Sequence, residues 1–202
     1  MTSGDRPPPE PRTPQVMLVM MEFAGSPQMI RTFQERLSRR FGLDFVLRDP
    51  WFDIEDCLDV TRGQYDSRMV LERLISHAKV PGDKILGVTN VDLFIPILTF
   101  VFGEAQLGGS VSVVSSHRLD NTVYGLPYLE SLLVERLDKE ATHELGHTFG
   151  LAHCAELECV MHSSTYVEEI DLKGADFCRD CKVRLTRGED RGPAASTDNL
   201  LQ

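Results

Sequence analysis

The stretch HELGHTFGLAH at residues 143–153 constrains this chain more than any other feature. On a helix, residues four apart lie on one face, so His143 and His147 can converge on one metal ion. Gly150 allows a left-handed turn that residues with a Cβ resist, and this turn can bring His153 to the same ion. Three neutral imidazoles leave one tetrahedral position open for water, which is typical of a catalytic zinc. The stretch therefore predicts a catalytic zinc site.

Glu144 directly follows the first of these histidines, so its carboxylate can reach a zinc-activated water as general base or acid. The shorter pattern HExxH occurs by chance on charged helices. With the composition of this chain, Gly and His fall at the two later positions with a probability of about 0.002, so chance is a poor explanation. The spacing leaves one alternative open, a site that binds zinc but has lost activity.

Four of the five cysteines lie between residues 154 and 181. Cys154, Cys159, Cys178 and Cys181 include a CxxC pair, and four thiolates complete a tetrahedral zinc site without an open position. Such a site is structural, and its binding free energy stabilises the loop that it gathers. Two disulfides or a redox-active CxxC are the alternatives. Cys57 lies far from the cluster and is predicted to be an ordinary buried thiol.

Composition and charge limit the partners of the chain. A length of 202 residues with 42% hydrophobic and 26% charged residues fits one globular domain. The formal net charge of −10 repels nucleic-acid phosphates and anionic lipids, so we expect neither as a partner. The proline-rich residues 1–15 lack the apolar run of a signal peptide, and the apolar stretch 93–103 is shorter than the roughly 20 residues that span a bilayer. We therefore expect a cytoplasmic location and no membrane contact, and cysteines clustered in a reducing compartment more often bind metal.

Hydrophobic patterning predicts alternating strands and helices in the first half of the chain, which is typical of a mostly parallel sheet. The predicted elements are a strand at 16–23, a helix from Ser26-Pro27 to Gly42, a strand at 43–48, a helix from Asp66 or Ser67 to Pro81-Gly82-Asp83, and a strand at 84–91. Two further strands, 99–104 and 110–116, predict an antiparallel edge, and we interpret 110–116 as the edge strand to which a substrate can pair. A long helix is predicted from Pro127 to Gly150.

The predicted fold class is α/β (α+β), with a mostly parallel twisted sheet, an antiparallel edge strand, a long active-site helix and a small zinc-stapled C-terminal subdomain. One domain is expected at 16–185, with an upper part at 16–150 and a lower part at 151–185. Residues 1–15 and 186–202 are predicted to be flexible tails.

These motifs together resemble the archaemetzincins, a branch of the metzincin clan of zinc metallopeptidases. The resemblance rests on HELGHTFGLAHC, CVM and CRDC, in that order, and it extends upstream to VDLFIPILTFVFGEAQLGG and SSHRL. It covers roughly residues 16–185 and implies a metzincin-like fold. Carried over residue by residue, it implies catalytic zinc ligands at His143, His147 and His153, a general base or acid at Glu144, the Met-turn residue at Met161, and a second zinc site at Cys154, Cys159, Cys178 and Cys181.

Met161 is more often a plain core residue in such a position, but its place eight residues after His153 favours the floor of the metal site. Two departures from the family pattern concern the region after it. The gap between Met161 and Cys178 contains sixteen residues, one fewer than is typical of the family. Ser163 stands where some other metzincins carry a tyrosine ligand, so a tyrosine-assisted mechanism is not expected, and we predict a packing role for Tyr166.

The sequence thus predicts a zinc-dependent metallopeptidase that hydrolyses peptide bonds through a zinc-activated water, with a second, structural zinc. Its expected cofactors are two Zn²⁺ ions per chain, and its expected partner is a peptide or protein substrate. The alternative is a non-catalytic, zinc-stabilised binding module on a metzincin-like fold. The intact Glu144 argues against this alternative, because a binding module has no need for a base beside a ligand.

Overall fold

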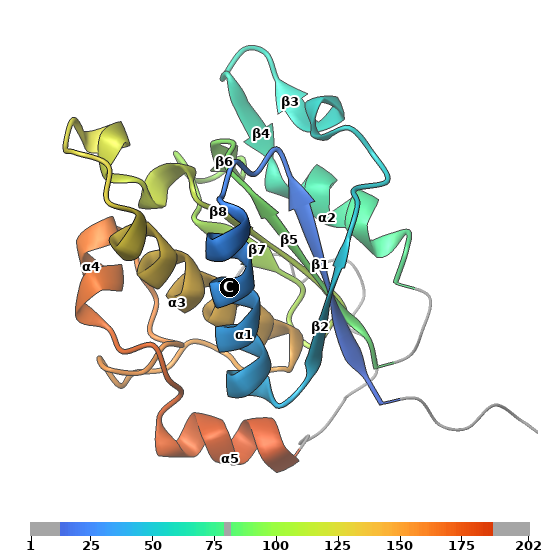
Figure 1. Ribbon diagram of the computed structural model, residues 1–202, viewed down its shortest axis with the longest axis vertical. Coiled ribbons are helices and arrows are strands. Elements are labelled where there is room, and N and C mark those ends of the chain that lie inside the picture. Colours follow the sequence, from blue (N-terminus) through green and yellow to red (C-terminus); the bar gives the residue numbers. More distant parts are fainter. Residues whose placement is uncertain (1–12, 79–81, 188–202) are drawn as a thin grey trace, which may run out of the picture.

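The computed structural model describes residues 13–78 and 82–187 (Figure 1). Strands and helices alternate in its first half, and the second half is mainly helical. In chain order the elements are β1 (Gln15–Met21), α1 (Pro27–Phe41), β2 (Asp44–Arg48), η1 (Ile54–Cys57), β3 (Leu58–Asp59), β4 (Gln64–Asp66), α2 (Ser67–Ile75), β5 (Lys84–Thr89), β6 (Leu93–Phe94), β7 (Gly103–Ala105), β8 (Val111–Ser115), η2 (His117–Leu119), η3 (Asn121–Tyr124), α3 (Glu130–Thr148), α4 (Val167–Leu172) and α5 (Arg179–Arg187).

The main sheet has the strand order β2-β1-β5-β8-β7. Its first four strands are parallel, and β7 pairs antiparallel with β8 at the edge. This arrangement confirms the predicted, mostly parallel sheet with an antiparallel edge strand. The assignment of 110–116 as that edge was wrong. These residues form β8, which is buried along its whole length because Val113 and Val114 pack into the cores on opposite faces of the sheet.

Helices cover both faces of the main sheet. On one face α1 and α3 lie side by side, and their apolar side chains share a core with β1, β5 and β8 (Figure 1). On the other face α2 packs Val70, Leu71 and Leu74 against the same strands. The sheet is therefore the middle layer of three, and the edge strand β7 contacts both α3 and α2.

The ends of the first two helices follow from local chemistry. The Ser26 hydroxyl accepts a hydrogen bond from the Met29 N–H, and Pro27 opens the first turn of α1. Gly42 ends the helix in the left-handed conformation, with a φ of 64°. For α2, the side chain of Asp66 is the N-cap and accepts from the Arg68 N–H. The predicted helix signals are confirmed at these positions.

Some boundaries differ from those expected from the sequence. The first strand begins at Gln15, which was assigned to the N-terminal tail, and α5 continues to Arg187, inside the expected C-terminal tail. The rest of both tails, 1–12 and 188–202, and Pro81 lie outside the described residues. The small sheet β3-β4-β6 was not predicted, because strands of two or three residues are too short for a periodic pattern. Within the described residues, no helix combines the length and apolarity needed to span a bilayer.

Candidate active site

Helix α3 carries the first part of the site and is buried along most of its length, including several charged side chains. Three of these charges form ion pairs with residues outside the helix. Arg136 forms an ion pair with Asp171 at 2.7 Å, Arg40 of α1 binds Asp138 at 2.8 Å, and Lys173 binds Glu140 at 2.7 Å. Charges buried at this depth require such partners, so the pairs fix how α3 is rotated against its neighbours.

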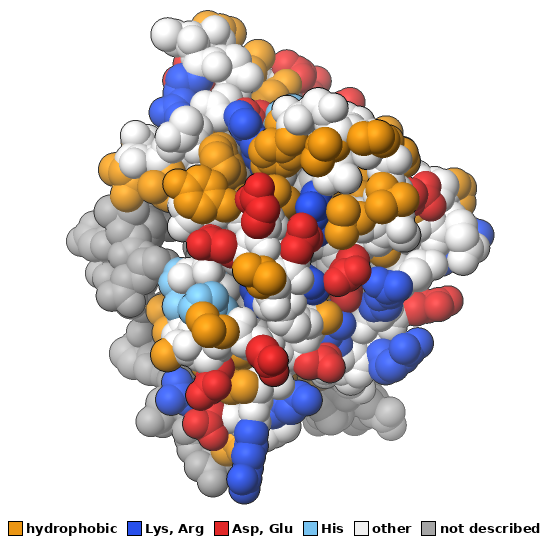
Figure 2. Space-filling view, turned by 90° about the vertical axis from the view of Figure 1, so that its left-hand side faces the viewer, with side chains coloured by type: hydrophobic (Ala, Val, Ile, Leu, Met, Phe, Trp, Pro, Cys, Tyr) orange, Lys and Arg blue, Asp and Glu red, His pale blue; other side chains and the backbone are white. Residues whose placement is uncertain are grey.

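The structure brings His143, His147 and His153 together. The Nε2 atoms of His143 and His147 lie 3.1 Å apart, and the ring centroid of His153 lies 5.2 Å and 5.0 Å from the other two. One ring nitrogen from each histidine falls within 4.8 Å of those of the other two. His143 is buried and His153 is exposed, so the cluster opens to solvent on the side of His153. Figure 2 shows histidine side chains at the surface on the face that carries α4.

Backbone carbonyls fix the orientation of two of these rings. The Nδ1 of His143 lies 2.8 Å from the Val160 carbonyl, and the Nδ1 of His147 lies 2.7 Å from the Leu151 carbonyl. Because a carbonyl oxygen can only accept, both Nδ1 atoms carry the proton, and the Nε2 lone pairs point to the shared centre. Burial lowers the pKa of His143 well below its ordinary value and that of His147 to about 4. Both imidazoles are therefore neutral at pH 7, as a metal ligand must be.

Two glycines shape the backbone and floor of the site. Gly150 ends the turn after α3 with a φ of 88°, a conformation that side chains with a Cβ rarely adopt, and it directs the chain toward His153. Gly146 lies between the two helical histidines, where an added Cβ would be 2.4 Å from the Sδ of Met161. Met161 is fully buried. Its thioether thus lies directly against the helix turn that carries the histidines, as a floor residue would.

Glu144 is buried beside the histidines and faces the edge strand β7. A Cβ at Gly103 would lie 2.6 Å from its Cγ, so only glycine at that position leaves room for the Glu144 side chain. Burial raises the pKa of Glu144 well above its ordinary value, and the neighbouring carboxylates of Glu140 and Glu104 raise it further. The charge of Lys173 acts in the opposite direction. A carboxyl group with a raised pKa can both accept and donate a proton near neutral pH.

The four clustered cysteines also meet at one point. Their Sγ atoms all lie within 4.8 Å of one another, and those of Cys154 and Cys178 are 3.8 Å apart. Sulfur atoms at this separation are not joined by a disulfide, whose bond is about 2.05 Å long. The Cys181 N–H bonds the sulfur of Cys178 and lowers the pKa of that thiol. Cys57 is buried elsewhere in the core, as predicted.

The two clusters are joined directly by the backbone. The Cys154 N–H donates to the Met161 carbonyl at 2.9 Å, and the Nδ1 of His162 lies 3.0 Å from the Cys154 carbonyl. Cys154 also follows His153 in sequence, so the same short segment holds both clusters.

Tyr166 belongs to neither cluster. The residue is 64% exposed, so the predicted packing role was wrong. It is the N-cap of α4.

Known proteins match this chain across both clusters. A sequence model of Peptidase family M54 matches residues 53–187. The archaemetzincin of Methanopyrus kandleri is 39% identical over 179 residues, covering 87% of this chain and 98% of the relative. The chain belongs to the archaemetzincin family. It is accordingly a zinc metallopeptidase, and the predicted family is confirmed.

Solved structures agree with this family assignment. The crystal structure of the M. kandleri archaemetzincin covers 89% of this chain with a TM-score of 0.76 and 36% identity, and 97% of that structure is matched. A zinc-dependent peptidase from Methanocorpusculum labreanum matches with a TM-score of 0.76 and 33% identity, over 84% of this chain and 99% of its own. The predicted metzincin-like fold class is therefore confirmed.

Several residues around the site were missed by sequence reasoning. Gly146 and Gly103 leave room for Met161 and Glu144, and the buried pair Lys173 and Glu140 lies one turn before the histidines. Gly146 could have been noticed from sequence, because a glycine inside a long helix lowers helix stability. Such a glycine usually has a packing or functional reason. The partner of Lys173 could not be found from sequence, because the two residues are far apart along the chain.

Proposed function

We propose that this archaemetzincin hydrolyses peptide bonds at a zinc ion held by His143, His147 and His153, with Glu144 as general base and acid. The observation that carries the proposal is the convergence of three neutral imidazoles beside a buried carboxyl group of raised pKa. A zinc ion bound there supplies Lewis acidity, which activates a water molecule and polarises the substrate carbonyl.

The donor geometry fits zinc. Tetrahedral zinc with Zn–N bonds of about 2.05 Å separates its nitrogen ligands by about 3.3 Å. The Nε2 atoms of His143 and His147 are 3.1 Å apart, and their lone pairs point to the shared centre. Backbone carbonyls bound to the Nδ1 atoms hold this orientation, as outer partners do in zinc sites.

The role of Glu144 follows from its burial. Its raised pKa favours taking a proton from the water that attacks the peptide carbonyl. The same carboxyl group can then return that proton to the leaving amine. The carboxyl group is confined between α3 and the edge strand, where Gly103 leaves it just enough room. This confinement keeps it in one place through both proton transfers.

The edge strand β7, in place of the buried segment 110–116, is the strand that a substrate can extend. It pairs with β8 on one side only, and it lies against Glu144 through Gly103. A peptide that adds to its free side would bring its backbone beside the three histidines. The expected substrate is therefore an extended peptide or an unfolded segment of a protein.

Glu144→Ala tests the mechanism. We expect peptide hydrolysis to fall at least about 100-fold, the usual scale for loss of a general acid or base. Zinc content and melting temperature should not fall, because Glu144 is not a ligand and its buried carboxyl group carries a desolvation cost. Turnover at the wild-type rate in this variant would refute the assigned role.

A second, structural zinc is proposed at the four cysteines. Tetrahedral zinc with Zn–S bonds of about 2.3 Å separates its sulfur ligands by about 3.8 Å, which equals the separation of Cys154 and Cys178. Elemental analysis of zinc-supplemented protein should give two zinc ions per chain, and Cys178→Ser should lower this number toward one. One zinc or fewer in the wild-type protein would refute the two-zinc proposal.

A non-catalytic binding module remains the competing function for the same site. If the protein is a binding module, peptides should stay intact in its presence although both zinc ions are bound. The buried, confined Glu144 favours catalysis, since its burial is costly and serves no ligand function. A cytoplasmic location and the absence of nucleic-acid partners remain predictions from charge and sequence.

A further inference from the structure

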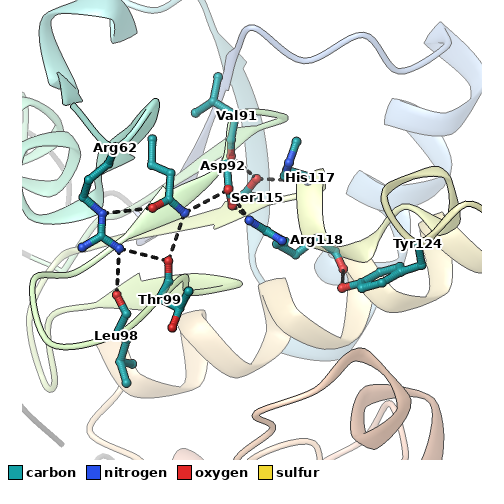
Figure 3. Close-up of polar contacts among 10 residues, drawn as sticks. Arg62, Val91, Asp92, Leu98, Thr99, Ser115, His117, Arg118 and Tyr124 are labelled. Carbon is teal, nitrogen blue, oxygen red and sulfur yellow. Dashed lines mark hydrogen bonds and ion pairs between the residues drawn. The ribbon is translucent and has the colours of Figure 1, made fainter. Parts of the chain in front are cut away.

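The segment before the edge strand is held by side chains from outside it. Residues 95–102 connect β6 to β7 and have exposed side chains at Ile97 and Leu98. The Arg62 guanidinium donates to the carbonyls of Leu98 and Thr99 at 3.1 Å each, and Gln64 donates to the Thr99 carbonyl at 3.0 Å (Figure 3). Two residues of the β3-β4 hairpin thus hold the backbone of this segment.

An ion pair connects the hairpin to the segments that follow β5 and β8. The Asp92 carboxylate accepts from both Nε and Nη2 of Arg118, with 2.8 Å to Nε, and from the Gln64 amide at 2.9 Å (Figure 3). Burial works to raise the pKa of Asp92, but the bonds from Arg118 and Gln64 outweigh it and lower that pKa. Arg118 also lies over the Phe100 ring at 4.8 Å. Asp92, Arg118, Gln64 and Arg62 therefore form a continuous polar chain, here named the brace.

The held segment leads directly into the catalytic machinery. The Val101 N–H donates to the Leu93 carbonyl at 2.9 Å, and the Phe102 carbonyl accepts from the Ser115 N–H of β8 at 2.8 Å. The next residue is Gly103, whose backbone lies against Glu144. Two residues thus separate the last carbonyl bound by the brace, that of Thr99, from Phe102, which precedes the edge strand.

We propose that the brace positions the edge strand β7 for pairing with substrate, with Arg62 and Asp92 as positioning residues. This inference rests on the proposed function, because it assigns the substrate backbone to β7. It also gives a role to the VDLF and SSHRL motifs, which contain Asp92 and Arg118 and which the zinc chemistry does not use. The substrate class is an extended peptide long enough to pair with the edge strand.

Arg62→Met tests the brace at an exposed residue. The Arg62 guanidinium lies 4.0 Å from the centre of the Phe94 ring, and methionine keeps an apolar side chain over that ring. Loss of three hydrogen bonds, two to the carbonyls and one to the Gln64 side chain, should raise the KM for a ten-residue peptide about 10-fold, with kcat within about two-fold of the wild-type value. Zinc content and melting temperature should stay close to those of the wild type. Amide hydrogen exchange in 101–105 should become about 10-fold faster. Asp92→Asn should act in the same direction, and Arg62→Lys should recover much of the loss, because lysine can still donate to the carbonyls.

Arg73→Met is the matched control. Arg73 lies half-exposed on α2 and pairs with Asp56 at 3.6 Å, so this variant removes a surface arginine without touching residues 95–102. Equal KM and equal exchange in the Arg62→Met and Arg73→Met variants would overturn the inference. The exchange measurement decides this even if no peptide is cleaved, whereas absent cleavage by the wild type would refute the proposed function alone.

Discussion

Gly146→Ala perturbs, through a single methyl group, the contact between Met161 and the helix turn that carries two of the histidines. The new Cβ would lie 2.4 Å from the Sδ of Met161 and 3.2 Å from its Cε, whereas ordinary contacts begin at 3.4 Å. Met161 or the helix must therefore move by 3.4 − 2.4 = 1.0 Å. Because Met161 is fully buried and Phe177 lies 3.3 Å from the same Cβ position, the sulfur has little free space to enter.

The two effects of this substitution on stability oppose each other. Alanine is favoured over glycine inside a helix by about 1 kcal/mol, whereas overpacking a core costs about 1–3 kcal/mol. The net loss is about 0–2 kcal/mol, or a fall in melting temperature of at most about 8 °C. A displacement of about 1 Å beside the three histidines costs on the order of 100-fold in rate. We therefore expect a large loss of peptide hydrolysis with a small loss of stability.

The assay measures peptide hydrolysis, zinc content and melting temperature on the same preparations. Gly42→Ala is the control, since Gly42 has a φ of 64°, has no atom within 4 Å of its Cβ position and lies outside the site and the brace. That variant should lose about 1–2 kcal/mol of stability through backbone strain and keep its activity. Wild-type activity in Gly146→Ala would refute the close contact between Met161 and the histidine turn as a requirement for catalysis.

Three further outcomes follow from the same structure. Lys173→Met leaves Glu140 buried without its partner and should lower the free energy of unfolding in urea by about 3–5 kcal/mol. Adding Glu140→Gln to this variant should restore part of the lost stability. An unchanged free energy of unfolding in the single variant would contradict the buried pair. In metal-free protein, the pKa of His147 falls on folding from 6.5 to about 4, so its contribution to stability is complete above about pH 6.5 and is lost as the pH falls toward 4, by at most about 1.4 kcal/mol per unit. Equal free energies of unfolding at pH 7 and pH 5 would contradict this. Cys178→Ser should also reduce peptide hydrolysis, because the segment that carries His153 loses its anchor; full activity with one zinc lost would show that the sites are independent.

Local chemistry explains why the clustering of the three histidines could be predicted from sequence. His143 and His147 share a helix face, and Gly150 permits the turn to His153, so the whole constellation lies within eleven residues. The clustering of the four cysteines could be predicted for a related reason. Cysteines that are close together in sequence commonly form a zinc site, a disulfide or a redox-active pair, and each of these brings the thiols together. Helix caps such as Ser26 and Gly42 also depend only on their neighbours in sequence.

Long-range pairing explains what the sequence left open. The segment 110–116 and the shorter β7 both carry strand-like patterns, and only the pairing of β8 with β5 decides which of the two is the edge. Lys173 and Glu140, or Arg118 and Asp92, read as ordinary surface charges until the fold brings each pair together. The contact between Gly146 and Met161 is equally invisible in sequence, because it depends on the path of the loop after His153.

The most direct test of the proposed function is cleavage-site profiling on a proteome-derived peptide library with zinc-loaded protein. The wild-type chain and Glu144→Ala would be compared at equal zinc content, so that metal occupancy cannot explain a difference. We predict new peptide termini that accumulate with time in the wild-type digest and are absent from the Glu144→Ala digest. An intact library in the wild-type digest, or the same termini at the same rate with both proteins, would contradict hydrolysis at the histidine site with Glu144 as its base.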